Sequence, residues 1–509
     1  MISFRNDTFT WTGHFAERNR AKDAGFRWHP GVKTWYTKSP FYALNLAAEA
    51  DISAKEALRP YLQNTLHSGL LDDVNGLFSP TIDPGYMPFQ KAGIWAATRR
   101  LEKQDSVAIF DQAGLGKTIQ AIGVLNELGF RKVLVICPAF LRNNWYKEMK
   151  KWWVNFDDPA VLFSRKDRTH GKSVICSYDL SEMLKPGWDC VIIDECHRLK
   201  NPTAKRTRKI LTSKDALVKG AKTVALSGTP LPNGKPEEVW TILSSLAPEV
   251  VSDFRDKWSF IYRYCEVEED AHGKYITGVK NHEELGQRLR ASGFMVRRLK
   301  SEVLTQLPDK RHNMIVVNPN SKARKLLEKE SAFDLDEILL HGGKIFASGL
   351  PELRRELGLT KIETSVEIIR ELMEAGADKI LVGAHHVDVV KGVAEGLSKY
   401  CRTEFITGAT SNDNRGRYVR DFQETEGPMA LVGQIDAIGE GLTLTAASDC
   451  VQVEESWVPG KNDQFSDRLH RIGQKNAVTV HHIVYENSLD AKILFRHTEK
   501  SLDSEKIVG

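Results

Sequence analysis

The chain has 509 residues, of which 41% are hydrophobic and 27% are charged, a composition typical of an ordinary globular protein and unlike that of a disordered or fibrous one. At roughly 100–200 residues per domain, this length predicts about three or four domains. Lysine plus arginine (71) exceeds aspartate plus glutamate (67) by only four. Any binding of nucleic acid must therefore rest on local basic patches rather than on net charge.

Cysteine usage and hydropathy indicate the compartment. The seven cysteines lack metal-ligand spacing, which favours reduced thiols in an intracellular protein. The chain starts without a signal-peptide pattern, and no apolar run approaches ~18 residues, so we expect no membrane segment and a cytoplasmic protein. The compact size and the absence of a basic nuclear-localisation run favour a bacterial or viral source.

Residues 1–75 are dense in aromatic side chains and predict a small separate α+β module. Trp28, Trp35 and Tyr36 lie among arginine and lysine residues. This mixture of aromatic and cationic side chains suits stacking on unpaired bases, which would make the module DNA-binding. The same three aromatics could instead form a small core, and the sequence leaves both interpretations open.

Two series of short apolar, β-branched runs follow, with helical stretches between the runs. Strands that are buried on both faces and alternate with helices predict parallel sheets, so each series predicts one α/β lobe. We assign the lobes to residues 76–250 and 361–509. Residues 251–360, between them, carry helical periodicity and charge pairs and predict a helical insertion. The predicted strands are Val107–Phe110, Val133–Cys137, Val191–Ile193 and Val224–Leu226 in the first lobe, and Ile380–Gly383, Glu404–Ile406, Ala430–Val432, Cys450–Val453 and Val478–Val484 in the second.

A glycine-rich segment follows the first predicted strand of the first lobe and precedes a predicted helix. Gly114 and Gly116 would let backbone N–H groups approach phosphates at a helix N-terminus, where the helix dipole favours anions. Lys117 would pair with the β- and γ-phosphates of a nucleotide, and Thr118 would offer its hydroxyl to Mg²⁺. The context of strand, loop and helix predicts a phosphate-binding loop.

Two carboxylates stand at the end of a neighbouring predicted strand. Asp194 would hold Mg²⁺, and Glu195 would position and deprotonate the attacking water. One cysteine and one histidine follow them, which is too few ligands for a tetrahedral zinc site. We therefore expect His197 to couple the nucleotide site to its neighbours.

The motifs occur in a characteristic order along the chain. Residues 111–118 read DQAGLGKT, residues 194–197 read DECH, residues 225–230 read ALSGTP and residues 464–474 read QFSDRLHRIGQ. This order resembles that of the superfamily 2 helicase-like motors, and specifically of the SNF2 ATPases. The last segment is the most diagnostic of the four.

The resemblance implies two RecA-like parallel-sheet lobes with an SNF2-type helical insertion, and a DNA-dependent ATPase that uses ATP and Mg²⁺. It implies that Gln90 reads the adenine base. Arg468 and Arg471 are three residues apart, which places them on one helix face. Both would reach the γ-phosphate as arginine fingers, and one such residue can supply ~10³–10⁵ in rate. The residues expected to couple the two lobes are His197, Gly228, Thr229, Gly441 and Gln464.

Contacts with DNA should go to the phosphate backbone, because a motor must accept every base sequence. Basic residues beside the motifs are candidates for these contacts, although a basic run is more often a solvated face than a phosphate contact. The candidates are Arg142, Lys200, Lys205, Arg206, Arg297 and Arg298.

The function predicted from the sequence is that of an ATP-dependent double-stranded-DNA translocase that remodels DNA structures or DNA–protein complexes. Thr443 and residues 457–460 (WVPG) are similar to the annealing-helicase branch of the SNF2 family, which points to fork remodelling or strand annealing in replication or repair. We expect a monomer that acts on double-stranded or forked DNA. The alternatives are a strand-separating DNA or RNA helicase and an ATP-gated DNA clamp.

Overall fold

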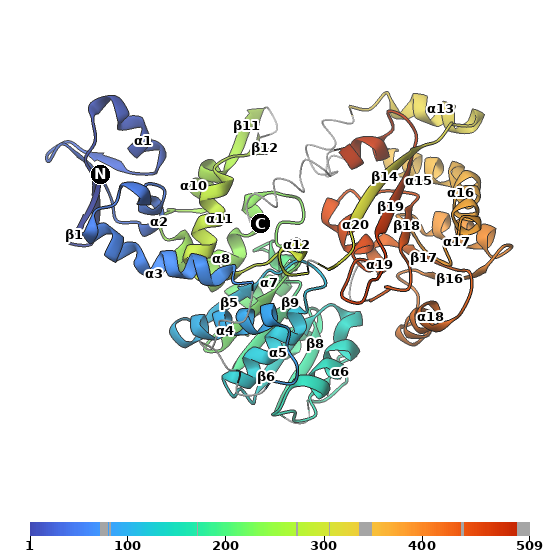
Figure 1. Cartoon of the computed structure of the whole chain (residues 1–509), viewed down its shortest axis with the longest axis horizontal. Helices are drawn as coiled ribbons and strands as arrows, with labels where there is room; N and C mark the ends of the chain where they lie inside the picture. The colour runs from blue at the N-terminus through green and yellow to red at the C-terminus, as the bar shows by residue number, and fades with distance from the viewer. Residues whose placement is uncertain are drawn as a thin grey trace.

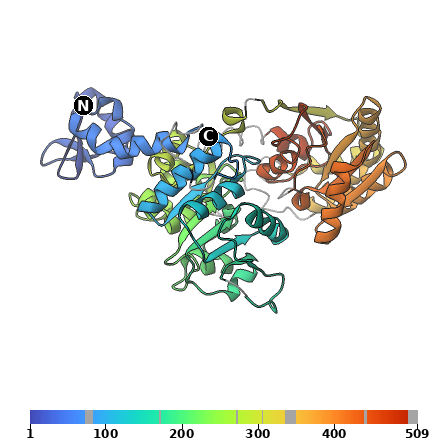
Figure 2. The ribbon, with the colours of Figure 1, turned by 60° about the horizontal axis from the view of Figure 1, so that its bottom comes forward.

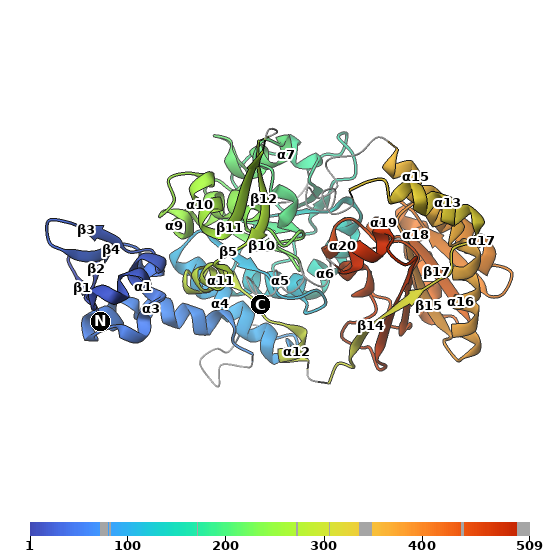
Figure 3. The ribbon, with the colours of Figure 1, turned by 90° about the horizontal axis from the view of Figure 1, so that it is seen from above.

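The computed structural model of the chain describes residues 1–71, 80, 83–169, 172–270, 273–304, 306–334, 349–438 and 442–495. An N-terminal module, a first lobe and a second lobe lie in a row (Figure 1). Views from two other directions agree that lobe 1 lies between the other two bodies (Figure 2, Figure 3). No helix in these ranges is long and apolar enough to cross a membrane.

Lobe 1 is built on a seven-stranded sheet in the order β13-β5-β10-β9-β6-β8-β7, in which every neighbouring pair is parallel. Its central strands are continuous apolar runs because alternate side chains enter two separate cores, one on each face. The strands are β5 (Ser106–Ile109), β6 (Val133–Cys137), β7 (Ala160–Val161), β8 (Val174–Ser177), β9 (Cys190–Asp194), β10 (Lys222–Leu226) and β13 (Met295–Val296). The helices are α4 (Pro88–Lys103), α5 (Lys117–Glu127), η3 (Ala139–Leu141), α6 (Arg142–Trp152), η4 (Leu180–Met183), η5 (Cys196–Leu199), α7 (Lys205–Thr207), η6 (Arg208–Thr212), η7 (Pro236–Glu238), α8 (Trp240–Leu246) and α9 (Pro248–Val251).

Lobe 2 repeats this architecture on a six-stranded parallel sheet in the order β14-β19-β18-β15-β17-β16. Two apolar cores again lie on its two faces. The strands are β14 (Lys310–Val316), β15 (Lys379–Ala384), β16 (Arg402–Ile406), β17 (Met429–Gln434), β18 (Asp449–Gln452) and β19 (Val478–Val484). The helices are α13 (Ser321–Glu330), α15 (Leu350–Thr360), α16 (Ile362–Glu374), α17 (Val387–Leu397), α18 (Asn412–Glu424), α19 (Ile435–Ile438) and α20 (Pro459–Ser466).

The N-terminal module is a four-stranded antiparallel sheet in the order β1-β2-β4-β3 with short helices beside it. Its own core holds Ile2, Phe9 and Trp11. Helix α3 runs from the module to lobe 1, where it packs on α11. The elements are β1 (Ile2–Arg5), β2 (Thr8–Trp11), η1 (Phe15–Glu17), α1 (Arg18–Asp23), β3 (Arg27–His29), β4 (Thr34–Thr37), α2 (Pro40–Leu44), η2 (Ala47–Glu49) and α3 (Ile52–Ser68).

Strands within residues 251–360 pair with two different lobes, and the bounds of the predicted helical insertion stay a prediction. The first part stands beside lobe 1, and β13 extends the lobe 1 sheet next to β5. After α12, strand β14 instead pairs with β19 in lobe 2 along seven residue pairs. Pairing between strands far apart in the sequence is invisible to local periodicity, which is why the division was missed. The elements of the first part are α10 (Lys257–Tyr264), the hairpin β11 (Cys265–Asp270) and β12 (Gly273–Val279), α11 (His282–Ala291) and α12 (Lys300–Val303).

All nine predicted strands are present, each within two residues of its predicted bounds. Strands β7, β8, β13 and β14 were not predicted, since two of them have only two residues and β14 is largely exposed. All seven cysteines are unpaired, and six of them are buried.

Candidate nucleotide site between the two lobes

The phosphate loop lies where the sequence predicts it, between the end of β5 and the start of α5. Two glycines in the loop have positive φ, +92° at Gly114 and +74° at Gly116. A Cβ atom on Gly116 would lie 2.4 Å from Gln90 Nε2, so both conformation and space require glycine there. A Cβ atom on Gly114 would lie 3.2 Å from Arg471 Cγ. The loop therefore faces an arginine of the opposite lobe.

Lys117 opens α5 and folds back over the loop. Its Nζ donates to the backbone carbonyls of Asp111 (2.9 Å) and Gln112 (3.4 Å). Burial lowers the pKa of Lys117, and the carboxylate of Glu195 opposes that shift. Thr118 stands beside it in the first turn of α5. A cation and a helix N-terminus thus meet at one place, the arrangement that binds phosphate.

Gln90 is buried beside this loop. Its Oε1 accepts a hydrogen bond from the backbone N–H of Met87 (3.0 Å) at the start of α4, and its Nε2 donates to the carbonyl of Leu115 (3.4 Å). These contacts tie α4 to the phosphate loop. That Gln90 reads the adenine stays a prediction.

A buried ion pair braces the loop from below, and the sequence reasoning missed it. Arg298 is 1% exposed and pairs with Asp111, its Nε lying 3.0 Å from Oδ1. It also donates to the carbonyl of Phe89 and to Gln120 Oε1, each at 2.5 Å. A Cβ atom on Gly93 would lie 2.3 Å from its guanidinium, so this glycine makes room for it. The donors of Arg298 are thus engaged inside lobe 1, and contact of this residue with DNA stays a prediction.

Asp194 ends β9 and is oriented by two aromatic residues. Trp145 Nε1 donates to Asp194 Oδ2 (2.8 Å), and the hydroxyl of Tyr178 donates to the backbone carbonyls of Asp194 (2.5 Å) and Glu195 (3.1 Å). Both aromatic side chains are buried. The sequence signal for Trp145 was present in the segment Asn143-Asn144-Trp145, but no spacing rule linked it to the carboxylate.

Glu195 adopts a left-handed conformation (φ 56°, ψ 51°), which is rare and strained for a residue with a side chain. Its buried Oε2 accepts no hydrogen bond from the part of the chain that the structure describes, and it lies 3.3 Å from His197 Nδ1. The same His197 nitrogen lies 3.0 Å from Ser227 Oγ. A Cβ atom on Gly228 would lie 3.2 Å from Lys117 Nζ. The structure thus places His197 and Gly228 in contact with the predicted catalytic groups.

Lobe 2 presents its two arginines to this site. Arg468 is buried and donates to the carbonyls of Gln464 (2.8 Å) and Leu442 (3.4 Å). Arg471 donates to the carbonyl of Asp467 (3.2 Å) and to Thr443 Oγ1 (3.3 Å). Burial and the neighbouring Arg468 hold the pKa of Arg471 well below its usual value. Arg471, which lies beside Gly114, therefore carries a positive charge in unfavourable surroundings, and a bound anion would stabilise that charge.

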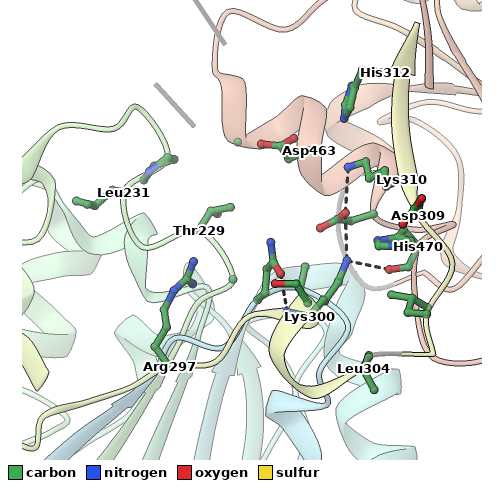
Figure 4. Close-up of a pocket in the computed structure, with 18 of the residues that line it drawn as sticks. Thr229, Leu231, Arg297, Lys300, Leu304, Asp309, Lys310, His312, Asp463 and His470 are labelled. Atoms are coloured by element: carbon green, nitrogen blue, oxygen red, sulfur yellow. Dashed lines mark hydrogen bonds and ion pairs between the residues drawn. The ribbon is translucent and has the colours of Figure 1, made fainter. Parts of the chain in front are cut away.

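The lobes also touch directly at the predicted coupling residues. Gln464 Nε2 donates to Thr229 Oγ1 at 2.7 Å, across the boundary between the lobes. Beside this bond lies a cavity of about 560 Å³, lined by Thr229 and Arg297 on one side and by Asp463 and His470 on the other (Figure 4). Gly441, the remaining predicted coupling residue, lies outside the described residues.

The connection between the lobes, which contains Lys300, Pro308 and Lys310, forms ion pairs and hydrogen bonds with the segment of lobe 2 that carries Arg468 and Arg471. Asp467, buried in lobe 2, lies 3.2 Å from Lys300 Nζ and 3.1 Å from Lys310 Nζ. Lys300 Nζ also donates to the carbonyl of His470 (2.8 Å), whose Nε2 lies 2.7 Å from the carbonyl of Pro308 (Figure 4). Burial lowers the pKa of Lys300 to about 8, and the two lysines hold the pKa of Asp467 below its usual range. The connection therefore sets where the two arginines stand.

Two further candidates for DNA contact, Arg142 and Arg297, are buried and hydrogen-bonded within lobe 1, and their contact with DNA stays a prediction. Arg142 is buried, with its Nε donating to the carbonyl of Ala139 (2.6 Å) and its Nη1 to that of Leu162 (2.6 Å). Arg297 is buried and donates to the carbonyl of Phe110 at 2.5 Å.

The remaining three candidates reach the surface. Lys200 pairs with Glu238 at 2.5 Å, while Lys205 and Arg206 are exposed on α7. Contact of these three with DNA stays a prediction.

Comparison with known proteins places this geometry in a family. The SNF2-related domain matches residues 89–350, just over half of the chain, and the helicase conserved C-terminal domain matches residues 360–473. The chain belongs to the SNF2 family of helicase-like ATPases, and its nucleotide is ATP. Among solved structures, the Sulfolobus solfataricus SWI2/SNF2 ATPase core in complex with dsDNA aligns over 84% of this chain and 96% of that chain, with 23% identity and a TM-score of 0.40.

Two groups of relatives are similar over most of this chain. The SWI/SNF-related matrix-associated actin-dependent regulator of chromatin subfamily A-like protein 1 of Xenopus laevis is 34% identical over 79% of this chain and 42% of its own length. The human DNA annealing helicase and endonuclease ZRANB3 is 30% identical over 86% of this chain and 41% of its own length. The chain thus spans about two fifths of these relatives. Both come from animals, so they give no support to the predicted bacterial or viral source.

Proposed function

We propose that the protein is an ATP-driven translocase on double-stranded DNA. The observation that carries the proposal is the position of Arg471 beside the phosphate loop, where a Cβ atom on Gly114 would lie 3.2 Å from Arg471 Cγ. A site with its lysine and carboxylates on one lobe and its arginines on the other is complete only when the lobes are together. Binding and hydrolysis of ATP then close and reopen the cleft, which converts chemistry into movement along a track.

The residues of the site fit ATP with Mg²⁺. Gly114 and Gly116 both have positive φ, and Gly116 has no space for a Cβ atom. Lys117 supplies a cation, and Thr118 and Asp194 are oxygen ligands suited to Mg²⁺. The metal, when bound, would neutralise charge on the transferring phosphoryl group. Glu195 has an oxygen without a hydrogen-bond donor in the described part of the chain, as a residue that accepts a proton from water requires. Arg468 and Arg471 would stabilise charge that develops at the γ-phosphate.

Double-stranded DNA is the proposed track, and remodelling of DNA structures or DNA–protein complexes is the proposed outcome. The relative named a DNA annealing helicase supports strand annealing as one such outcome, at a replication fork or in repair. The exposed pair Lys205 and Arg206 on α7 is the proposed contact with the phosphate backbone.

Steady-state ATP hydrolysis measures this proposal directly. Wild-type protein and Glu195→Gln are each tested without nucleic acid and with single-stranded DNA, duplex DNA, forked DNA and duplex RNA. We expect duplex or forked DNA to stimulate ATP hydrolysis by the wild type strongly. In the Glu195→Gln variant the stimulated rate should be lower by a factor of ~10²–10⁴. Stimulation by single strands or RNA alone would favour a strand-separating helicase, and DNA binding without turnover would favour an ATP-gated clamp.

A further inference from the structure

A row of aromatic side chains crosses the sheet of the N-terminal module and emerges at its edge. Trp11 on β2 is directly opposite Trp35 on β4, which is opposite Trp28 on β3. Directly opposed residues share one face of a sheet. Exposure rises along the row, from 2% at Trp11 through half-buried Trp35 to 48% at Trp28. The module's core therefore uses Trp11 and leaves Trp28 available.

A further aromatic side chain lines the same pocket as this row. Phe15, in η1, is 75% exposed, and the guanidinium of Arg18 lies 4.3 Å from the centre of its ring. Trp28, Trp35 and Phe15 line one pocket of about 510 Å³ together with Arg18 and Lys33. Exposed aromatic rings that line an open pocket are costly in water unless something stacks on them.

The positive charge of the pocket indicates which kind of ligand it can bind. Arg18 and Lys33 line it, and no carboxylate among the described residues does. Glu17, the acid next to Arg18 in sequence, lies 3.7 Å from Arg20 instead. Flat rings together with unopposed cations fit a flat ring that carries phosphate, and they fit a neutral or cationic peptide less well.

We infer that this pocket binds an unpaired nucleobase of a single DNA strand, stacked on Trp28, with Arg18 and Lys33 at the flanking phosphates. Of the two interpretations that the sequence left open, base stacking fits Trp28, which is 48% exposed, whereas half-buried Trp35 also packs against the module's core. It goes beyond the proposed motor function, which needs duplex DNA at the two lobes and no unpaired base.

The module is joined firmly to lobe 1, so a strand held there is held relative to the motor. Asn64 Nδ2, on α3, donates to the carbonyl of Ala291 (2.9 Å), and Ser68 Oγ donates to the carbonyl of Met295 on β13 (2.5 Å). Lobe 2 lies on the far side of lobe 1 from the N-terminal module (Figure 1, Figure 3). The pocket therefore marks a position for a single strand on the lobe 1 side of the motor.

The test measures binding of the full chain to a fluorescent oligothymidylate by anisotropy, without ATP. We expect Trp28→Ala to weaken binding about tenfold, the effect of losing one stacked base, and Trp28→Phe to restore most of it. Trp258→Ala, which removes a tryptophan of similar exposure (45%) from lobe 1, is the matched control and should bind as the wild type does. An oligonucleotide of the same length that lacks bases should bind the wild type and Trp28→Ala equally.

A second measurement locates the bound oligonucleotide on the chain, because binding by the two lobes could mask a loss of binding at the module. An iodouracil-bearing oligothymidylate is cross-linked by light to the wild type, and the attached peptides are identified by mass spectrometry. Cross-links at Phe15, Trp28 or Trp35 support the inference. Cross-links confined to the lobes, equal binding by Trp28→Ala, or binding of a proline-rich peptide in place of the oligonucleotide would overturn it. Stimulation of ATP hydrolysis by duplex DNA in Trp28→Ala reports on the motor separately, so the two proposals can fail independently.

Discussion

Two arginines lie on either side of the phosphate loop, Arg298 buried and Arg471 half-buried, and their surroundings differ. Arg298, in lobe 1, has a carboxylate partner in Asp111 and further acceptors at Phe89 and Gln120. Arg471, in lobe 2, donates only to a backbone carbonyl and a hydroxyl, and among the described residues no carboxylate lies within ion-pair distance of it.

The difference teaches how to separate a structural arginine from a catalytic one. A buried cation with its counter-charge supplied by the protein is already neutralised, and removing it leaves an uncompensated buried charge. A cation whose pKa is lowered by burial and by a second arginine lacks that compensation, and a phosphate can supply it. The predictions below test this contrast, from the largest expected effect to the smallest.

The catalytic side of the comparison is tested by Arg471→Ala. We expect ATP hydrolysis to fall by ~10³–10⁵, as for loss of an arginine finger, with the melting temperature unchanged. The measurement is turnover at saturating ATP, with thermal unfolding as control. A variant that unfolds easily but retains its turnover would place Arg471 with Arg298 as a structural residue.

The structural side is tested by Arg298→Met. Because Asp111 would remain buried without its partner, we expect a loss of about 3–5 kcal/mol in the free energy of unfolding, measured with denaturant. The double variant Arg298→Met with Asp111→Leu removes both charges and should recover most of that loss. If the double variant does not recover stability, the ion pair stabilises the fold by more than the mutual neutralisation of its two charges.

The connection between the lobes predicts a dependence on pH. Burial lowers the pKa of Lys300 from 10.5 to about 8, so between these values the unfolded chain binds more protons than the folded one. Stability of the wild type relative to Lys300→Met should therefore rise with pH across this window. Above pH 8 the uncharged lysine also loses its attraction to Asp467, and ATP hydrolysis should fall in the wild type. Denaturant unfolding of both proteins at several pH values measures the first effect, and a flat difference would contradict it.

The smallest effect concerns the exposed cations of lobe 1. We expect the double variant Lys205→Ala with Arg206→Ala to reduce the salt dependence of duplex binding, lowering the slope of log K against log salt by about one for each phosphate that the protein no longer neutralises. Stability should stay unchanged, since both side chains are exposed. An unaltered slope would remove α7 from the DNA-binding surface.

Local chemistry made half of the site predictable. The phosphate loop, the carboxylates after β9 and the nine predicted strands were all recognisable from the sequence, because each depends on neighbours within a few residues. Trp145, Tyr178 and Asp111 were missed as parts of the site, since their partners lie elsewhere in the chain. Three of the six candidates for DNA contact, Arg142, Arg297 and Arg298, are buried, which the sequence could not show, because it shows that an arginine is charged without showing what neutralises it.

The sequence by itself determined the order of elements, the backbone conformation of the loop and the identity of the reactive groups. Only the tertiary structure decided which cations remain available. Asp111 and Arg298 are 187 residues apart, and Lys300 reaches Asp467 from the other end of the connection. Burial and counter-charge are properties of the folded surroundings, and they separate the arginine that holds the loop from the arginine that faces the phosphate.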